Sequence, residues 1–360
     1  MQARGRGSAR PPVGVAFEGD LGRRLDAVLV VALLNGLAAK GESRSIALAI
    51  SRPSLKSAQL ADVLSRFYAS RPAGPAMIGM PEGPAAATDA AAVAAALFKP
   101  AADGTEPHAS RITNLLDTAD NAVLIRNMLL AQHDENAVIV VAGPATGLAR
   151  LLGLYGAPPQ IATKVKHLVI AAGAFPAGGP DADLASDVAA ARRVFADWPT
   201  PVIAVGAEVG IAVPYPGASL ARDFAWSPSH PVADAYRALK PMPYDAPASA
   251  LAATLHAVHP EANYFTLSEP GTISVLDDGR TQFAPAAGGR HRYLIVNPAQ
   301  KARVSQLYAE LVSAEPARRP ARGGPPPQQQ EQQKPPDPPA KPADAPAAKP
   351  AETPRPPAPQ

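Results

Sequence analysis

The stretch VAFEGDLGRRLDAVLVVALL, residues 15–34, decides how the rest of this 360-residue chain is interpreted. Its apolar start is typical of a buried parallel strand. A turn rich in charged side chains follows, and the apolar run after that turn predicts a helix over 25–39. Carboxylates gathered where a strand passes into a helix are typical of a metal or sugar site. The alternative is that Asp20-Leu-Gly22 forms an ordinary Asp-Gly turn.

Other short apolar runs alternate with stretches of helical periodicity along the chain. The runs expected to be strands are 13–17, 45–51, 76–80, 137–142, 167–172 and 201–206. The stretches expected to be helices are 25–39, 54–69, 117–132, 145–154 and 184–197. This alternation predicts a doubly wound, mostly parallel α/β sheet with helices on both faces. Ligands bind such sheets in the crevice at the carboxyl ends of the strands, so the turns there are where a site is expected.

The remaining segments are less regular. Residues 272–283 predict a β-hairpin, because an Asp-Gly pair between apolar runs is a strong hairpin signal. Residues 250–259 predict a helix. Residues 212–246 are expected to be a loop, as are residues 81–109 apart from a short helix near 89–98.

The two ends of the chain differ in composition from the part between them. Residues 1–12 lack hydrophobic periodicity, and 315–360 contain no Val, Ile, Leu, Met, Phe, Trp or Tyr. Such segments cannot bury enough apolar area to offset the entropy lost on ordering. We therefore expect disordered ends around one α/β domain over 13–314. The proline-rich tail suits proline-recognising modules as partners.

Charge and composition exclude several classes of protein. The formal net charge is +3, but the two ends carry an excess of five positive charges, which leaves 13–314 slightly acidic. No nucleic-acid-binding motif is present, so no nucleic-acid partner is expected. The absence of cysteine excludes disulfides and thiolate metal sites. No apolar run approaches the ~20 residues that span a bilayer. No membrane partner is therefore expected, and cytoplasmic localisation is the default expectation.

Two local motifs have ordinary explanations. Residues 143–147, GPATG, lack the lysine of a P-loop and indicate a turn that opens a helix. Asp181, Asp183 and Asp187 lack the Gly and Glu of a calcium-binding loop, and Asp183 instead suits the N-cap of the helix that follows it. The seven histidines form no metal-binding pattern and are expected to be surface or packed residues.

Considered together, the turns and strands resemble the inosine/uridine-preferring nucleoside hydrolase family, of which this chain looks like a divergent member. The family opens with a strand, an Asp-x-Asp-x-Gly turn and an Asp-Asp pair. The similarity holds in order and spacing over 13–314. It rests on EGDLGRRLDA (18–27), AVIVVAGPATGLARLLGL (137–154), HLVIAAGAF (167–175) with DVAAARRVF (187–195), PVIAVGAEVG (201–210) and YDAP (244–247).

The resemblance implies hydrolysis of the N-glycosidic bond of a ribonucleoside, with one calcium ion that holds the ribose hydroxyls and a water molecule. It implies that Asp20 is both a calcium ligand and the base. Asp245 and the carbonyl of Ala142 are implied as further calcium ligands. Asp26 matches a ribose contact, and Tyr244 stands where the family has its leaving-group acid, a histidine.

The resemblance also implies three further sugar contacts and an assembly. Arg52 lies about where a ribose-binding Asn is expected, and Asp181 and Asp183 lie roughly where Glu and Asn contact the sugar. Relatives commonly form dimers or tetramers, so a homo-oligomer is implied.

The first turn departs from the family pattern at three positions. Ala27 replaces an acidic calcium ligand, and Arg23 and Arg24 add positive charge. One hypothesis is that an arginine head group takes the cation's place, paired with Asp20 and Asp245, in a metal-free protein that binds a ligand or partner without catalysis. The alternative is that both arginines point outward from the helix start.

Overall fold

A computed structural model describes residues 11–69, 75–83, 91–100, 104 and 107–316. All of them belong to the first of two compact units, Met1–Arg319, and only this unit is described. The predicted disordered ends lie almost wholly outside the described residues, as does the start of the short helix expected near 89–98.

The described residues form strands that agree closely with the predicted apolar runs. The strands are β1 (Val13–Gly19), β2 (Ser43–Ile50), β3 (Ile78–Met80), β4 (Ala119–Asp120), β5 (Ala137–Ala142), β6 (Val165–Ile170), β7 (Val202–Ala204), β8 (Thr266–Leu267), β9 (Gly271–Val275), β10 (Thr281–Pro285) and β11 (His291–Ile295).

The helices lie between these strands and after them. They are α1 (Leu25–Ala39), α2 (Leu55–Tyr68), α3 (Ala92–Leu97), α4 (Asn121–Leu130), α5 (Thr146–Gly153), α6 (Ala157–Lys164), α7 (Ala182–Ser186), α8 (Val188–Asp197), α9 (Ala207–Ala212), α10 (Ala218–Arg222), α11 (Pro231–Leu239), α12 (Ser249–Val258) and α13 (Pro298–Val312), with a 3₁₀ turn at Leu115–Asp117. None of these helices is long and apolar enough to cross a membrane.

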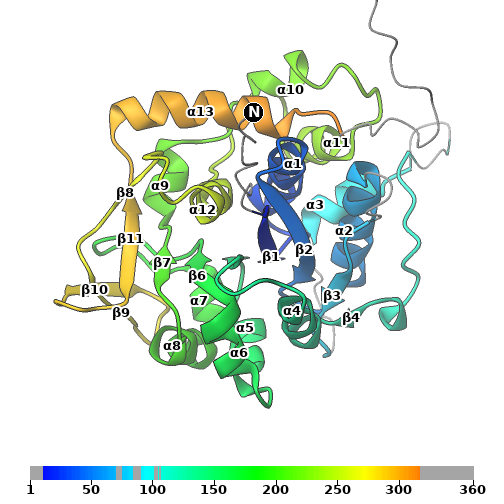
Figure 1. The fold of residues 1–360 in the computed structure, drawn as a ribbon. Coiled ribbons are helices and arrows are strands. Elements are labelled where there is room, and N and C mark those ends of the chain that lie inside the picture. Colours follow the sequence, from blue (N-terminus) through cyan, green and yellow to red (C-terminus); the bar gives the residue numbers. More distant parts are fainter. Residues whose placement is uncertain (1–10, 70–74, 84–90, 101–103, 105–106, 317–360) are drawn as a thin grey trace, which may run out of the picture. The chain divides into compact units, whose positions relative to one another are not determined.

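The strands form one sheet in the order β10-β9-β11-β7-β6-β5-β1-β2-β3-β4, with β8 paired to β11. Pairing is parallel from β11 to β4 and antiparallel where β8, β9 and β10 join the edge. The predicted doubly wound, mostly parallel α/β sheet is therefore confirmed (Figure 1). The predicted hairpin is confirmed too, because β9 and β10 pair around Gly279, whose φ is +82°.

Strand order reverses at the centre of the sheet. β1 has β2 on one side and β5 on the other, so the chain moves outward from β1 in one direction and later returns to its opposite flank. A crevice opens at the carboxyl ends of such a strand pair. The Asp20 N–H donates to the Ala142 carbonyl at 2.9 Å and closes the turns that follow β1 and β5. The switch point therefore lies beside Asp20.

Each face of the sheet has its own apolar core. Side chains alternate along a strand, so Phe17 of β1 belongs to the core that contains residues of α1, α2, α11, α12 and α13. Ala16 belongs to the core on the other face, which contains residues of α4, α5, α6 and α8. The two helical layers are visible above and below the sheet in Figure 1. Helix α1 is buried almost all round between the sheet and α12 and α13. Gly36 lets α13 approach it, since a Cβ there would lie 2.2 Å from the Leu311 carbonyl oxygen.

Two expectations about the second half of the chain are wrong. Residues 212–246 were expected to be a loop, but they contain α10 and α11. Their prolines suggested a loop, yet Pro231 begins α11, where a missing N–H costs nothing. The single helix expected over 184–197 is split, because Asp187 ends α7 and caps α8 by accepting from the Ala190 N–H at 3.0 Å.

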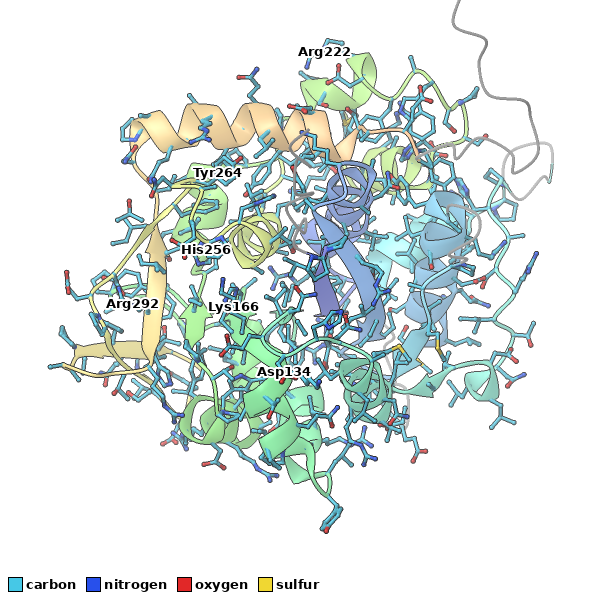
Figure 2. The ribbon with its side chains drawn as sticks, in the orientation of Figure 1. Asp134, Lys166, Arg222, His256, Tyr264 and Arg292 are labelled. Atoms are coloured by element: carbon cyan, nitrogen blue, oxygen red, sulfur yellow. The ribbon has the colours of Figure 1, made fainter. Side chains whose placement is uncertain are left out.

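Two buried histidines face each other between α12 and β6. His256 and His167 have ring centroids 6.2 Å apart (His256 is labelled in Figure 2), which confirms the expectation of packed histidines for this pair. Burial lowers the pKa of His256 to about 3 and that of His167 to about 4. Both are neutral in the folded chain at neutral pH.

We expect acid to destabilise the protein through these two histidines. Their pKa values in the folded chain lie below the ordinary 6.5, so the unfolded chain binds more protons as the pH falls from 6.5 to about 4. Each should lower the free energy of unfolding by about 1.4 kcal/mol per pH unit over that window. In urea titrations across this range, His256→Leu should flatten the slope by about one such contribution, whereas exposed His133→Leu should not. Equal slopes in the two variants would contradict the prediction.

Candidate functional site

Charged side chains from three turns meet at the switch point. Asp20 and Arg24 follow β1, Arg52 follows β2, and Asp183 lies on α7 after β6, while Asp26 belongs to the first turn of α1. Four ion pairs of 2.8–3.1 Å join them. The carboxyl ends of parallel strands meet at one edge of a sheet, which is why residues far apart in the sequence form this cluster.

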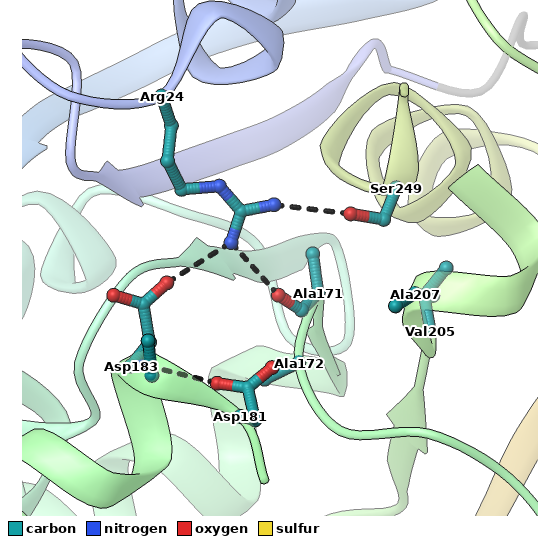
Figure 3. Close-up of a pocket in the computed structure, with 9 residues that line it drawn as sticks. Arg24, Ala171, Ala172, Asp181, Asp183, Val205, Ala207 and Ser249 are labelled. Atoms are coloured by element: carbon teal, nitrogen blue, oxygen red, sulfur yellow. Dashed lines mark hydrogen bonds and ion pairs between the residues drawn. The ribbon is translucent and has the colours of Figure 1, made fainter. Parts of the chain in front are cut away.

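The Arg24 guanidinium lies at the centre of the cluster (Figure 3). Its Nε and Nη2 donate to the two carboxylate oxygens of Asp26 at 3.0 and 2.8 Å. Its Nη1 donates to the Ala171 carbonyl and to Asp183, both at 3.1 Å, and Nη2 also donates to the Ser249 hydroxyl at 3.0 Å. A guanidinium has five N–H groups, so every donor of Arg24 has an oxygen partner.

Asp26 is held as a carboxylate by this arrangement. Burial by itself would raise its pKa, but the charge and hydrogen bonds of Arg24 outweigh burial and lower the pKa below its ordinary value. The Ala250 N–H at the start of α12 donates a further hydrogen bond at 2.9 Å. Asp26 and Arg24 therefore neutralise each other inside the protein.

Arg52 joins the other two carboxylates. Its Nε donates to Asp20 at 2.8 Å and its Nη2 donates to Asp183 at 3.0 Å. Asp183 thus accepts a hydrogen bond from Arg52 at Oδ1 and one from Arg24 at Oδ2. Arg23 is half exposed and its Nε lies 3.9 Å from Asp20, so this contact is weak.

Asp20 is the most enclosed carboxylate of the turn and is only 3% exposed. Burial raises its pKa above the ordinary value, and the hydrogen bond and charge of Arg52 reduce this effect without cancelling it. A carboxylate with a raised pKa accepts a proton more readily than an exposed one.

A pocket of about 220 Å³ adjoins this cluster (Figure 3). Asp181 forms one wall as the N-cap of α7: its Oδ1 accepts from the Asp183 and Leu184 N–H groups at 2.9 and 3.0 Å, and its Oδ2 accepts from the Gly173 N–H at 2.9 Å. The pocket is lined by Arg24, Ala171, Ala172, Asp181, Ala182, Asp183, Val205, Ala207 and Ser249.

The structure brings together most of the residues singled out from the sequence, although their functional roles remain predictions. Those at the cluster and its pocket are Asp20, Asp26, Arg52, Asp181 and Asp183. Ser249 and the Ala171 carbonyl were not predicted from the sequence. They lie 225 and 147 residues from Arg24 along the chain, and no sequence pattern predicts a hydrogen bond over such a separation.

Tyr244 and Asp245 make their hydrogen bonds with residues outside the cluster. The Tyr244 hydroxyl donates to the Tyr236 carbonyl at 2.6 Å, and the Tyr236 hydroxyl donates back to the Tyr244 carbonyl at the same distance. Their rings stack 4.4 Å apart, and burial raises the pKa of Tyr244 to about 12. Asp245 is exposed and accepts from the Gly217 N–H at 2.9 Å. No hydrogen bond or ion pair among the described residues joins either residue to Asp20.

These positions do not fit the calcium shell that the resemblance implies. Calcium takes six to eight oxygens. Within the described ranges no group of three or more Asp, Glu, His or Cys residues is arranged to hold a metal. The side chain of Ala27 is fully buried and carries no oxygen, and one acceptor site of the Ala142 carbonyl is taken by the Asp20 N–H.

The hypothesis of an arginine in the cation's place needs a correction in its partners. Arg24 does point inward, but it pairs with Asp26 and Asp183 rather than with Asp20 and Asp245. The alternative, an outward orientation, describes the half-exposed Arg23 alone.

Comparison with known proteins shows the fold. No family model and no curated sequence matches the chain. Among solved structures, an inosine-guanosine nucleoside hydrolase is similar, with a TM-score of 0.64 and 15% identity over 83% of this chain and 98% of that one. A purine-preferring ribonucleoside hydrolase from Gardnerella vaginalis is similar as well, with a TM-score of 0.63 and 16% identity over 83% and 98% of the two chains.

A third similar structure has a ligand in its description. It is the type III effector protein XopQ complexed with adenosine diphosphate ribose, with a TM-score of 0.59 and 15% identity over 86% of this chain and 94% of that one. At such identities the likeness shows the fold alone. The chain therefore has the α/β fold of nucleoside hydrolases.

We expect Asp181 to stabilise the pocket wall as a cap. Asp181→Ala removes an acceptor that three backbone N–H groups share, so the free energy of unfolding should fall by about 1–2 kcal/mol. Asp181→Asn keeps an acceptor for the cap and should lose less. Chemical denaturation of the two variants checks this, and equal losses would show that the cap is not what Asp181 contributes.

Proposed function

We propose that the domain binds the ribosyl group of a ribonucleoside or related N-riboside in the pocket beside Arg24 and hydrolyses its N-glycosidic bond. The observation that carries the proposal is the pocket at the carboxyl ends of β6 and β7, next to the charged cluster, whose wall offers carboxylate oxygens while its guanidinium is fully paired. Similar structures described as nucleoside hydrolases support the reaction class. The structure described with adenosine diphosphate ribose supports a ribosyl-containing ligand.

The charge of the cluster favours a neutral ligand. Apart from the half-exposed Arg23, whose contact with Asp20 is weak, the ion-paired groups are the carboxylates of Asp20, Asp26 and Asp183 and the guanidinium groups of Arg24 and Arg52. Among these groups, negative charge slightly exceeds positive charge. A phosphate in the pocket would be repelled by this excess negative charge, and no free guanidinium would be left to pair with it. A sugar brings no charge and avoids the desolvation cost of a buried ion.

The hydrogen-bonding capacity of the pocket favours a ligand that donates. All five N–H groups of Arg24 are used. Asp181 Oδ2 and the two carboxylate oxygens of Asp183, in contrast, each accept one hydrogen bond from the protein and have a second acceptor site for a ligand. Ribose hydroxyls are donors, and two of them on adjacent carbons suit neighbouring carboxylates.

The size of the pocket fits one part of a nucleoside. A volume of about 220 Å³ equals that of about seven water molecules at ~30 Å³ each. It is below the ~300–1,000 Å³ of pockets that enclose drug-sized ligands. A sugar ring fits this space, and the base lies outside it.

Asp20 does not line the pocket itself, but Arg52 joins it to Asp183 of the pocket wall, and it is the residue we assign to proton transfer. Hydrolysis passes through an oxocarbenium-like state, which neighbouring carboxylates stabilise. Water bonds to the anomeric carbon as the C–N bond breaks, and Asp20, with its raised pKa, receives the water's proton. The base leaves with the electron pair of the C–N bond and takes a proton from solvent water. The Tyr244 hydroxyl is bound to Tyr236, so we assign it no part in departure of the base.

We expect calorimetry to detect binding of inosine, uridine, adenosine and ribose, and weaker binding of ribose 5-phosphate. Asp183→Asn removes a charge on which both arginines depend and should weaken riboside binding about 10-fold or more. The control Asp197→Asn changes a surface carboxylate 3.9 Å from Arg193 and should leave binding unchanged. Tighter binding of the phosphate ester than of ribose would overturn the assignment of the pocket. The same panel tests the expected preference for inosine and uridine.

We expect the wild-type chain to release free base from at least one of these nucleosides, measured by chromatography. Asp20→Asn should lower that rate by about 10²–10⁴-fold while nucleoside binding persists. Wild-type protein that binds nucleosides and releases no base would refute hydrolysis. In that case the ligand-binding, metal-free alternative stands as the function.

A further inference from the structure

We propose that the guanidinium of Arg24 is a built-in cation that organises this site in place of a divalent metal ion, so that the protein binds its ligand without metal. That the site binds a riboside ligand rests on the proposed function. The claim that Arg24 replaces a metal ion does not, because it concerns only the chain's own residues.

The first support is the oxygen shell around Arg24. Two carboxylates, one backbone carbonyl and one hydroxyl surround the guanidinium, with five N···O distances of 2.8–3.1 Å. Carboxylate, carbonyl and hydroxyl oxygens are the kinds of group that also bind hard cations. The planar fork of a guanidinium fits carboxylates in the bidentate manner seen at Asp26.

The second support is electrostatic. A divalent cation at this place would lie against a permanent positive charge, since Arg24 cannot lose its proton in a protein. The attraction of Asp26 and Asp183 for that cation is already used by Arg24. The buried methyl group of Ala27 adds no carboxylate to restore the balance.

The third support is the way the backbone presents Arg24. The backbone N–H of Arg24 donates to the Asp20 carbonyl at 2.8 Å. Arg24 directly precedes the first residue of α1 and has an extended backbone, with φ of −104° and ψ of 114°. This extended conformation turns the side chain into the crevice instead of along the helix (Figure 3). The neighbouring Arg23 is half exposed, so the turn separates an inner arginine from an outer one.

The test combines calcium titration with removal of the side chain. Calorimetry and thermal unfolding of the wild type should show no calcium binding and the same Tm in calcium and in chelator. Arg24→Ala should lower the Tm, because Asp26 and Asp183 lose their partner. A guanidinium or calcium salt should restore part of that Tm, while sodium chloride at equal ionic strength should not.

Arg23→Ala is the matched control on the same turn. It removes an arginine that makes only a weak contact at 3.9 Å, so its Tm should stay close to that of the wild type and should not respond to added cations. If Arg24→Ala does not fold, Arg24→Lys takes its place in the thermal unfolding measurements. Lysine keeps the charge but cannot donate to all five oxygens, so its Tm should lie below that of the wild type in every salt.

Two results would overturn the proposal. One is stoichiometric calcium binding by the wild type that Asp20→Asn abolishes. The other is a Tm for Arg24→Ala, or for Arg24→Lys if it alone folds, equal to that of the wild type. Failure of the proposed function looks different. In that case calcium leaves the Tm of the wild type unchanged, and guanidinium or calcium restores part of the Tm of Arg24→Ala. No riboside binds to the wild type.

Discussion

The pairing of Arg24 with Asp26 and Asp183 is the interaction on which the site depends. All three side chains are largely withdrawn from water, and a buried charge without a partner is costly. The pairing joins the first turn of α1 to α7, and the Ala171 carbonyl and Ser249 extend it to the end of β6 and the start of α12. One guanidinium therefore fixes the relative positions of elements that surround the switch point of the sheet.

This interaction also sets the chemistry that the pocket can perform. The guanidinium is saturated, so the groups left to meet a ligand are hydrogen-bond acceptors with a slight excess of negative charge. A metal-centred site on the same fold would attract water and hydroxyls through a divalent charge. If Arg24 takes the place of a metal ion, as we propose, the same fold would hold two physically different centres, and the side chains of the first turn would determine which one forms.

Much of the fold follows from local patterns. Apolar runs of strand length between helical stretches predicted β1, β2, β5 and β6 and the helices α1, α2 and α5 to within a few residues, because burial on both faces of a parallel sheet demands such runs. The errors arose where one residue type occurs in two kinds of structure. Proline near Pro231 suggested a loop but starts a helix, and Asp187 divides a periodic stretch by capping α8.

The sequence by itself determined the α/β class, the place of the charged turn after β1, and the nearness of Asp20 to Asp26 along the chain, since these depend on short-range spacing. Only the tertiary structure decided that Arg24 points inward, because its partners Asp183 and Ser249 lie 159 and 225 residues away along the chain. The same holds for Tyr244, whose hydroxyl is bound by a neighbouring helix instead of facing the pocket. Spacing brings residues to one edge of a sheet, but the direction of a charged side chain depends on where distant elements place the oxygens that balance it.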